Sequence, residues 1–470
     1  MLNRVFQLRE NRTNVRTELL AGLTTFLTMS YIIFVQPAVL SGAMFNMQTG
    51  LDFGAVTVAT CVSAALATLI MGLYARYPIV LAPGMGENFF FVFSAIPAAT
   101  AAGFANGWQV ALGVVFISGL LFLILSLVGI REMIMNSISP NMKNAVAVGI
   151  GLFIAFIGLR NAGLIVTDPG TAVKLNPHFA SPDLIVFFFG LCLTAVLEAR
   201  RFRGAILWGI LATTGLAIAL KLILPMLPDA FVSSPIIKES MLMTRFSITH
   251  QFFAMPPSVA PTFFKMDIVH ALSASMWPFI VIFLFMDVFD TIGTLIGVGE
   301  RAGLMKDNKL PRARQAFLAD AAGTVIGACL GTSTVTSFVE SAAGVEQGGR
   351  TGLTGVTAAV LFLLALFLTP LIAMVGSYAP ITAPALVIVG SMMLQNVKNI
   401  DWSDPSEFLP AFLTILGIPL SYSIADGLAL GFISYPIVKA FSGRTKEVYW
   451  LSYVLAAVLL LYFIFIRSNS

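Results

Sequence analysis

Residues 81–90 read LAPGMGENFF and interrupt an apolar run that is otherwise long enough for a membrane-spanning helix. Pro83 and Gly84 disfavour a continuous helix at this point. Backbone that leaves a helix inside a membrane must line a cavity or pack on protein, because lipid offers it no hydrogen-bond partners. Glu87 and Asn88 follow at once. We therefore expect a short extended stretch and then a helix start at a buried polar site. A kink with a polar packing contact is the alternative.

Residues 331–344 read GTSTVTSFVESAAG and repeat these features in the second half of the chain. The β-branched stretch 334–336 favours an extended strand, and the alanines that follow Glu340 suit a helix. We expect Glu340 at the start of that helix, opposite the first-half site. The alternative is an ordinary helix whose Ser and Thr hydroxyls bond back to its own carbonyls.

Residues 285–295 read FMDVFDTIGTL and place Asp287 and Asp290 three apart, on one helix face. A carboxylate at membrane depth costs roughly 2.5–3.5 kcal/mol on insertion scales, so it usually faces a cavity, a partner or a substrate. Two such groups side by side are suited to exchanging a proton. We expect Asp287 to contact a substrate, whereas a structural contact is the alternative for Asp290. Asp320 is expected near the membrane interface.

The composition excludes a soluble protein. Of the 470 residues, 58% are hydrophobic and only 11% are charged, whereas a soluble domain carries about 25% charged residues. The mean hydropathy is +0.91. These values predict a polytopic membrane protein with about twelve to fourteen spanning segments. The net charge of +4 lies in short loops and does not indicate nucleic-acid binding, and the three cysteines and three histidines fit no metal-site spacing.

Basic loops predict the topology, because Lys and Arg accumulate on the cytoplasmic side. The arginine-rich N-terminus, residues 1–16, is expected in the cytoplasm and contains no cleavable signal peptide. Residues 198–204 (EARRFRG) and 300–315 (ERAGLMKDNKLPRARQ) are further cytoplasmic loops. The first half then contains seven segments and ends in a polar loop at 227–267. We expect a multi-pass protein of the cell membrane.

A second set of seven segments would enter the membrane with the opposite orientation. Weak internal similarity supports such a repeat, since residues 144–159 resemble residues 383–397. Inverted repeats place a substrate site near the bilayer midplane, between broken helices. Residues 409–447 resist the scheme. One interrupted segment and a pair of short helices are both compatible with their sequence. Positive-inside counting places their Lys and Arg residues in the cytoplasm, whereas an ideal seven-plus-seven count places them outside, and a short helical hairpin is one solution.

These stretches resemble a known family, the nucleobase:cation symporter-2 family, in its azaguanine/hypoxanthine/adenine permease-like branch. The resemblance covers both halves of the chain in order. The stretches that carry it are ELLAGLTTFLTMSYIIFVQP (18–37), LAPGMGENFF (81–90), GIGLFIAFIGLRNAG (149–163), FDTIGTLIGVGERAGL (289–304), GTSTVTSFVESAAGVEQGGRTGLT (331–354) and GLALGFISY (427–435).

The resemblance implies a proton-coupled secondary active importer of purine nucleobases, with hypoxanthine, guanine or adenine as substrate. Its partners would be the base and the lipid bilayer, without nucleic acid, and a homodimer through the gate domain is compatible with it. No cofactor is implied. A proton is the expected coupling ion, and sodium is not excluded. Which purine is preferred stays open.

The implied fold is an all-α polytopic membrane protein of about fourteen segments in two inverted repeats, with short strands and half-helices in segments 3 and 10. The repeats would span 1–226 and 268–470, joined by the loop at 227–267. A core domain would move against a gate domain in an elevator motion. The core would take residues 17–130 and 268–372, and the gate residues 140–226 and 380–467.

The implied substrate site centres on Asn88, Asp287 and Glu340. Asn88 offers a donor and an acceptor that suit the amide edge of a planar heterocycle, and a Phe ring can stack on its face. The complete expected set is Asn88, Asp287, Glu340, Gly86, Phe89, Phe338 and Val339. Expected proton-coupling groups are Glu87, Asp290 and Glu340.

One residue departs from the family pattern. Many relatives carry Leu between the glycine and the asparagine, in the sequence GLNA, whereas this chain has Glu87 there. The extra carboxylate puts the transfer of substrate preference in doubt, and its role stays open.

Two other classes of protein compete with this interpretation. An intramembrane aspartyl protease needs aspartates on separate segments in YD and GxGD contexts, and neither context occurs, so we do not expect an enzyme. An anion or other small-solute transporter of the same fold is the alternative. Acidic residues at the site argue against an anion as the ligand.

Overall fold

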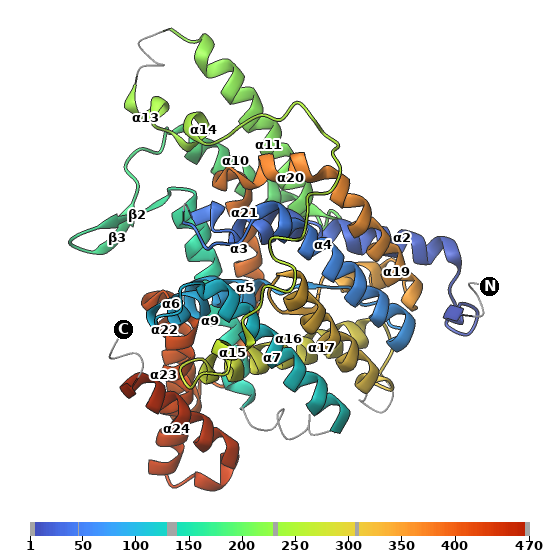
Figure 1. Ribbon diagram of the computed structural model, residues 1–470, viewed down its shortest axis with the longest axis vertical. Coiled ribbons are helices and arrows are strands. Elements are labelled where there is room, and N and C mark those ends of the chain that lie inside the picture. Colours follow the sequence, from blue (N-terminus) through green and yellow to red (C-terminus); the bar gives the residue numbers. More distant parts are fainter. Residues whose placement is uncertain (1–4, 46, 129–138, 229–233, 306–309, 466–470) are drawn as a thin grey trace.

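The structure is a computed structural model that describes residues 5–45, 47–128, 139–228, 234–305 and 310–465. Within these ranges the chain is mostly helical, with two small two-stranded sheets (Figure 1). Ten of the described helices are long and apolar enough to cross a membrane. The expected polytopic membrane class is therefore correct.

The described residues of the first half form nine α-helices, three short strands and four short turns of 3₁₀- or π-helix. In chain order they are α2 (Val15–Met29), α3 (Ile32–Leu40), η1 (Ala43–Phe45), α4 (Phe53–Ile70), η2 (Met71–Ala75), β1 (Leu81–Pro83), α5 (Met85–Phe90), η3 (Phe91–Ala95), α6 (Ile96–Ala101), α7 (Gly107–Val128), α9 (Pro140–Asn161), β2 (Ile165–Asp168), β3 (Ala172–Leu175), α10 (Pro182–Ala199), α11 (Ala205–Ile223) and η4 (Leu224–Met226).

The second half follows a connecting loop that holds two one-turn helices. Its elements are α13 (Pro235–Lys238), α14 (Met241–Thr244), α15 (Ile268–Ala271), α16 (Trp277–Arg301), α17 (Ala313–Leu330), β4 (Val335–Ser337), α18 (Ser341–Glu346), α19 (Gly352–Ala365), η5 (Leu366–Leu368), α20 (Thr369–Gly376), α21 (Ala379–Met393), η6 (Leu394–Asn399), α22 (Pro405–Ser421), α23 (Ile424–Phe441), η7 (Thr445–Glu447) and α24 (Trp450–Phe465).

Local sequence explains where several helices begin. Ser139 and Ser181 each cap a helix, because the serine hydroxyl accepts a hydrogen bond from the backbone N–H three residues later, that of Met142 or Leu184. A proline follows each serine. Ser followed by Pro is favourable because the hydroxyl satisfies a free N–H and proline fits the first helical turn. These caps begin α9 and α10, two helices of the first half that pack against second-half helices.

The two halves interlock into two groups of helices. In the first group α19 packs on α2 and α4, and α17 packs on α4 and α7. In the second group α9 packs on α21 and α22, while α10 packs on α11 and α21. Figure 1 shows the orange α19 lying beside the blue α2 and α4. Helices far apart in sequence therefore share each group.

The second group contains a very close helix crossing at two glycines. A Cβ added to Gly390 of α21 would lie 2.4 Å from the carbonyl oxygen of Gly151 of α9, and one added to Gly151 would lie 2.8 Å from the Gly390 carbonyl oxygen. Side chains at either position would force the helices apart. The crossing joins the two stretches whose sequences resemble each other.

The Pro-rich region is a helical hairpin. Its helices α22 and α23 are joined at Tyr422, which adopts a left-handed conformation with φ 54°. At the open end Lys439 Nζ lies 2.8 Å from Glu407 Oε1. The Asn141 side chain, in the first turn of α9, also donates to Glu407, at 2.8 Å. This end of the hairpin therefore packs beside the start of α9, and its cytoplasmic location stays a prediction.

One feature differs from expectation. Strands β2 and β3 form a hairpin with Ile165 opposite Leu175, in a region where no strand was expected. The turn carries Asp168-Pro-Gly, a strong turn signal that could have revealed it. The helix α24 follows the α22–α23 hairpin as an additional apolar element, at the bottom of Figure 1.

Candidate functional site

The site is built around an antiparallel pair of three-residue strands, β1 and β4. Leu81 pairs with Ser337 and Pro83 with Val335. The pairing extends beyond the strands, since Gly84 N–H donates to the Thr334 carbonyl at 2.9 Å. The two broken segments therefore meet backbone to backbone, as the sequence predicted for an extended stretch in each.

Two threonines hold the strands in equivalent ways. Thr68 of α4 bonds through its hydroxyl to Leu81, at 2.9 Å to the N–H and 3.1 Å to the carbonyl. Thr324 of α17 bonds to Val335, at 3.2 Å and 3.0 Å. Each hydroxyl satisfies strand groups that the short sheet leaves free, which is essential in a buried setting.

Each strand leads into a six-residue helix, as expected. Gly84 precedes α5, and Glu340 precedes α18 with helical backbone angles. Helix α18 is pressed against α2, because a Cβ on Gly344 would lie 2.0 Å from Thr25 Oγ1. The position of Glu340 is thus set by a strand before it and a tightly docked helix after it.

Asn88 is fully buried, and both ends of its amide are occupied. Its Nδ2 donates to Gln36 Oε1 of α3, and its Oδ1 accepts from the Ser333 hydroxyl. Gln36 in turn donates to the Thr332 hydroxyl at 2.9 Å. This amide network joins α3 to both broken segments. In this conformation Asn88 contacts protein partners.

A second buried network contains Asp287 and Asp320. Thr324 donates to Asp287 Oδ2 at 2.9 Å, while Oδ1 of Asp287 is buried without a hydrogen-bond partner. Asp320 accepts from Thr291 at 2.6 Å and from Ser337 at 2.8 Å. Asp320 is 0% exposed, and its expected place near the membrane interface stays a prediction. Asp320 stabilises strand β4 through the hydrogen bond that it accepts from Ser337.

Glu87 is buried beside this network with both carboxylate oxygens lacking a hydrogen-bond partner. It folds back over the strand end, because a Cβ on Gly84 would lie 2.2 Å from Glu87 Oε2. Electrostatic interactions link Glu87 to Asp290 and Asp320. An ionised carboxylate without a partner is very costly in such a place.

Asp290 and Glu340 are the accessible acidic groups. Asp290 is exposed although it interacts electrostatically with the interior Glu87 and Glu340, so it faces inner space and not lipid. Glu340 is half-buried, and Tyr31 donates to its Oε1 at 3.0 Å. Val339 is 56% exposed. Added Cβ atoms at two glycines of α16, Gly293 and Gly297, would meet nothing within 4 Å.

The other expected contacts are enclosed. Phe89 is 0% exposed within a ring cluster that includes Phe93 and Phe153, and Phe338 is 6% exposed. A Cβ on Gly86 would lie 3.3 Å from Ile150 of α9. The structure therefore gathers all expected residues around the strand crossing, but only Glu340, Val339 and Asp290 face open space.

Several members of these networks escaped sequence reasoning. They are Tyr31, Gln36, Thr68, Thr291, Asp320 and Thr324. Asp320 and Thr324 lie four apart, on one face of α17, in the otherwise apolar stretch FLADAAGT (317–324). An acid with a hydroxyl one turn away in such a stretch is a usable signal of a buried polar face. Tyr31 and Gln36, in the first membrane-spanning segment, carried no comparable signal. Among the described residues, no group of three or more His, Cys, Asp or Glu side chains could hold a metal ion.

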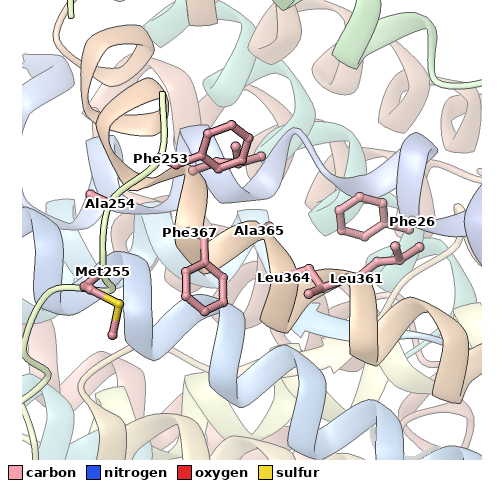
Figure 2. A pocket seen from close by; sticks show the side chains of 9 residues that line it. Phe26, Phe253, Ala254, Met255, Leu361, Leu364, Ala365 and Phe367 are labelled. Atoms are coloured by element: carbon pink, nitrogen blue, oxygen red, sulfur yellow. The ribbon is translucent and has the colours of Figure 1, made fainter. Parts of the chain in front are cut away.

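A separate apolar cavity of about 730 Å³ lies between α2, α19 and the connecting loop. Figure 2 shows Phe253 and Met255 of the loop opposite Leu361, Leu364 and Phe367. None of the expected site residues lines it. Without polar groups it offers no hydrogen bond to a heterocycle, and we do not assign the site there.

Comparison with protein families decides which kind of protein has this arrangement. The family model described as the permease family matches residues 16–430. The chain belongs to the permease family. This permease is accordingly a membrane transporter and not an enzyme, in agreement with the absence of protease contexts in its sequence.

Full-length relatives extend this finding. The guanine/hypoxanthine permease PbuG of Bacillus subtilis is 44% identical over 467 residues, which cover 98% of this permease and 99% of the relative. The adenine permease AdeP of Escherichia coli is 38% identical over 470 residues, covering 100% of this permease and 97% of the relative.

A solved structure shares the fold at low sequence identity. The transmembrane domain of a cyanobacterium bicarbonate transporter, BicA, has a TM-score of 0.62 and 14% identity, with coverage of 89% of this permease and 97% of that domain. At this identity the likeness concerns the fold and carries no information on substrate.

Proposed function

We propose that this permease is a proton-coupled importer of purine nucleobases, with hypoxanthine, guanine or adenine as substrate. The main support for this proposal is the accessible Glu340 at the crossing of two broken segments, with Asp290 and Asp287 nearby. Carboxylates accept hydrogen bonds, so they select a ligand rich in N–H groups and repel an anion. Full-length similarity to permeases named for guanine, hypoxanthine and adenine gives the ligand class.

In the proposed complex the base lies between the third and tenth segments. Glu340 and Asp287 accept hydrogen bonds from its ring N–H or amino groups. Asn88 exchanges its bonds to Gln36 and Ser333 for bonds to the base, and the backbone at Gly86 approaches the ring. The apolar contacts come from Phe89, Phe338 and Val339.

The coupling proton is proposed to reside on the group formed by Glu87 and Asp290, with Glu340 as the third candidate. No side-chain hydroxyl, amide or basic group donates to the oxygens of Glu87, and its carboxyl group is paired with that of Asp290. A proton on this pair removes the cost of a buried unpaired charge. Its release to the cytoplasm restores repulsion among the acidic groups and weakens the site.

Transport is proposed to proceed by movement of a core domain, residues 17–130 and 268–372, against a gate domain, residues 140–226 and 380–467. The two interlocked groups of helices support this division. The equivalent threonine contacts on β1 and β4 support two inverted repeats of seven segments each. We place the protein in the cell membrane with a cytoplasmic N-terminus, and a homodimer would form through the gate domain.

Uptake of radiolabelled hypoxanthine, guanine and adenine into cells that lack their own purine permeases tests the proposal. Wild type is expected to accumulate at least one base, and unlabelled uracil or bicarbonate should not compete. Glu340→Gln and Asp287→Asn should each lower uptake at least about tenfold, because each removes a charged acceptor worth roughly 1.5–3 kcal/mol.

Matched amide variants at surface acids provide the control. Asp168→Asn, in the turn of the β2–β3 hairpin, and Glu239→Gln, at an exposed position, make the same chemical change away from the strand crossing and should transport like wild type. Normal uptake by both Glu340→Gln and Asp287→Asn at equal surface abundance would contradict the site. Absence of uptake of every purine by wild type would contradict the substrate class.

A further inference from the structure

Tyr31 lies at a break in the first membrane-spanning segment. Helix α2 ends at Met29 and α3 begins at Ile32. Just before the break, Thr28 bonds back through its hydroxyl to the carbonyls of Thr24 and Thr25, at 3.2 Å and 2.8 Å. Back-bonding of this kind bends helices. The bend directs the Tyr31 side chain inward, where it is 2% exposed.

The buried Tyr31 hydroxyl reaches Glu340, one of the two accessible carboxylates at the strand crossing. It donates to Oε1 of Glu340 at 3.0 Å. Hydrogen bonds to an ionised acceptor are about twice as strong as neutral ones. The contact joins positions 309 residues apart in sequence, so a residue of the first segment fixes a side chain of the tenth.

The rest of Glu340 is held by backbone. Strand β4 precedes it, and the close contact of Gly344 with Thr25 docks α18 on α2. Thr28 adds a weak contact of 3.5 Å from its hydroxyl to the Glu340 carbonyl. With the backbone fixed, the side-chain torsions are the remaining freedom, and the bond to Tyr31 restrains them.

We propose that Tyr31 is a positioning residue for substrate binding, which orients Glu340 so that Oε1 is held by the phenol and Oε2 receives an N–H of the base. The inference rests on the proposed function, because it assigns Glu340 to substrate. Tyr31 itself is too buried to contact a ligand in this conformation. It acts by pre-organisation, which lowers the ordering cost of binding.

A chemically matched control exists in the second group of helices. Tyr378 is also fully buried, and its hydroxyl donates to a carboxylate, Asp183 Oδ1, at 2.7 Å. Tyr31→Phe and Tyr378→Phe therefore delete the same atom from the same kind of bond. Only the first bond involves a residue assigned to substrate.

The test measures hypoxanthine uptake against concentration for both variants, normalised to surface abundance. Tyr31→Phe should raise KM about tenfold with little change in maximal rate, because a bond to a charged group is lost. Tyr378→Phe should leave KM within about twofold of wild type. An unchanged KM in Tyr31→Phe, with wild type transporting normally, overturns the inference while the proposed function stands. A wild type that transports no purine contradicts the proposed function itself.

The double variant shows whether Tyr31 acts through Glu340. In the Glu340→Gln background, Tyr31→Phe should raise KM much less than in wild type, since the effects of coupled residues are not additive. Equal effects in both backgrounds overturn the positioning role. If Tyr31→Phe does not reach the membrane, Tyr31→Gln, which keeps a donor, is compared with Tyr31→Met, which does not. The inference expects the lower KM for Tyr31→Gln, and equal values overturn it.

Discussion

Glu87 is the residue that separates this chain from the family pattern, and the structure gives it an unusual setting. The chain provides no hydrogen bond to either of its oxygens, although Asp290 and Asp320 interact with it electrostatically. The leucine expected from the family pattern would fill similar space without a charge. Glu87 therefore adds a titratable group to a site that is already acidic.

Replacing Glu87 tests this added group. Glu87→Leu should keep purine uptake, because the groups assigned to substrate remain, but uptake should depend less on external pH between about 5.5 and 8 than in wild type. Initial uptake rates across this range provide the measurement, with Asp168→Asn as the unaffected control. A pH profile identical to that of wild type would remove Glu87 from the coupling group.

Asp320 carries a structural prediction. Its carboxylate accepts two hydrogen bonds from buried hydroxyls, those of Thr291 and Ser337. Asp320→Ala leaves both hydroxyls without this acceptor, and an unsatisfied buried polar group costs about 1–3 kcal/mol. The purified variant should therefore unfold at a lower temperature than wild type, whereas Glu239→Ala at the exposed surface should not. Unchanged thermal stability would show that the network reorganises at little cost.

At the scale of elements, the two strands and their threonine supports form the centre of the molecule. Thr68 and Thr324 each bond to both backbone groups of one strand residue. We expect Thr68→Val and Thr324→Val both to lower the thermal unfolding temperature, because each loses buried strand bonds of about 1 kcal/mol, and Thr324→Val at least as much, because Thr324 also donates to Asp287. Thr57→Val is the matched control, since the Thr57 hydroxyl bonds only to the Phe53 carbonyl of its own helix. Equal loss in all three variants would contradict a special role for the strand contacts.

Sequence reasoning succeeded where the signal is local. Pro83 and Gly84 rule out a helix on their own, and β-branched residues favour strand β4, so both breaks and both helix starts were predicted. The α22–α23 hairpin was only one of the solutions that the sequence left open, and the structure decides for it. The β2–β3 hairpin was overlooked although its turn signal is local.

The partners within the site could not be predicted in the same way. Asn88 meets Gln36 because two segments cross, and no pattern within either segment records the crossing. Asp320 shows the same limit, since its distance from a basic loop indicated depth in the membrane but not the element it faces. Long-range hydrogen bonds depend on packing, which hydropathy and spacing do not determine.

At the scale of the whole molecule, the response of the acidic site to pH must be distinguished from the response of other titrating groups. Hydrogen bonds from Ser406 and the adjacent Arg444 guanidinium lower the pKa of Asp404 to about 2. Because this folded value lies below the unfolded value of about 3.9, the stabilising contribution is present above about pH 4 and is lost as pH falls through 2. The ion pair between Asp404 and Arg444, at the open end of the α22–α23 hairpin, therefore stays intact from about pH 5 to 8.

The thermal stability of the hairpin and the uptake of substrate should therefore respond to pH independently. Arg444→Gln should lower the thermal stability of the protein by the same amount at about pH 5.5 and pH 8, because Asp404 is ionised at both. The pH response of uptake should stay that of wild type in this variant. A stability loss confined to one of these pH values would show that another titrating group controls the hairpin.

Uptake into proteoliposomes tests the central claim most directly. The purified permease is reconstituted, and entry of radiolabelled hypoxanthine is measured with an acid-outside pH gradient, without a gradient, and with the gradient collapsed by a protonophore. The account predicts accumulation above equilibrium only with the acid-outside gradient, and its loss in Glu340→Gln. Accumulation driven by a sodium gradient at equal pH, or equilibration without dependence on either gradient, would contradict proton-coupled import.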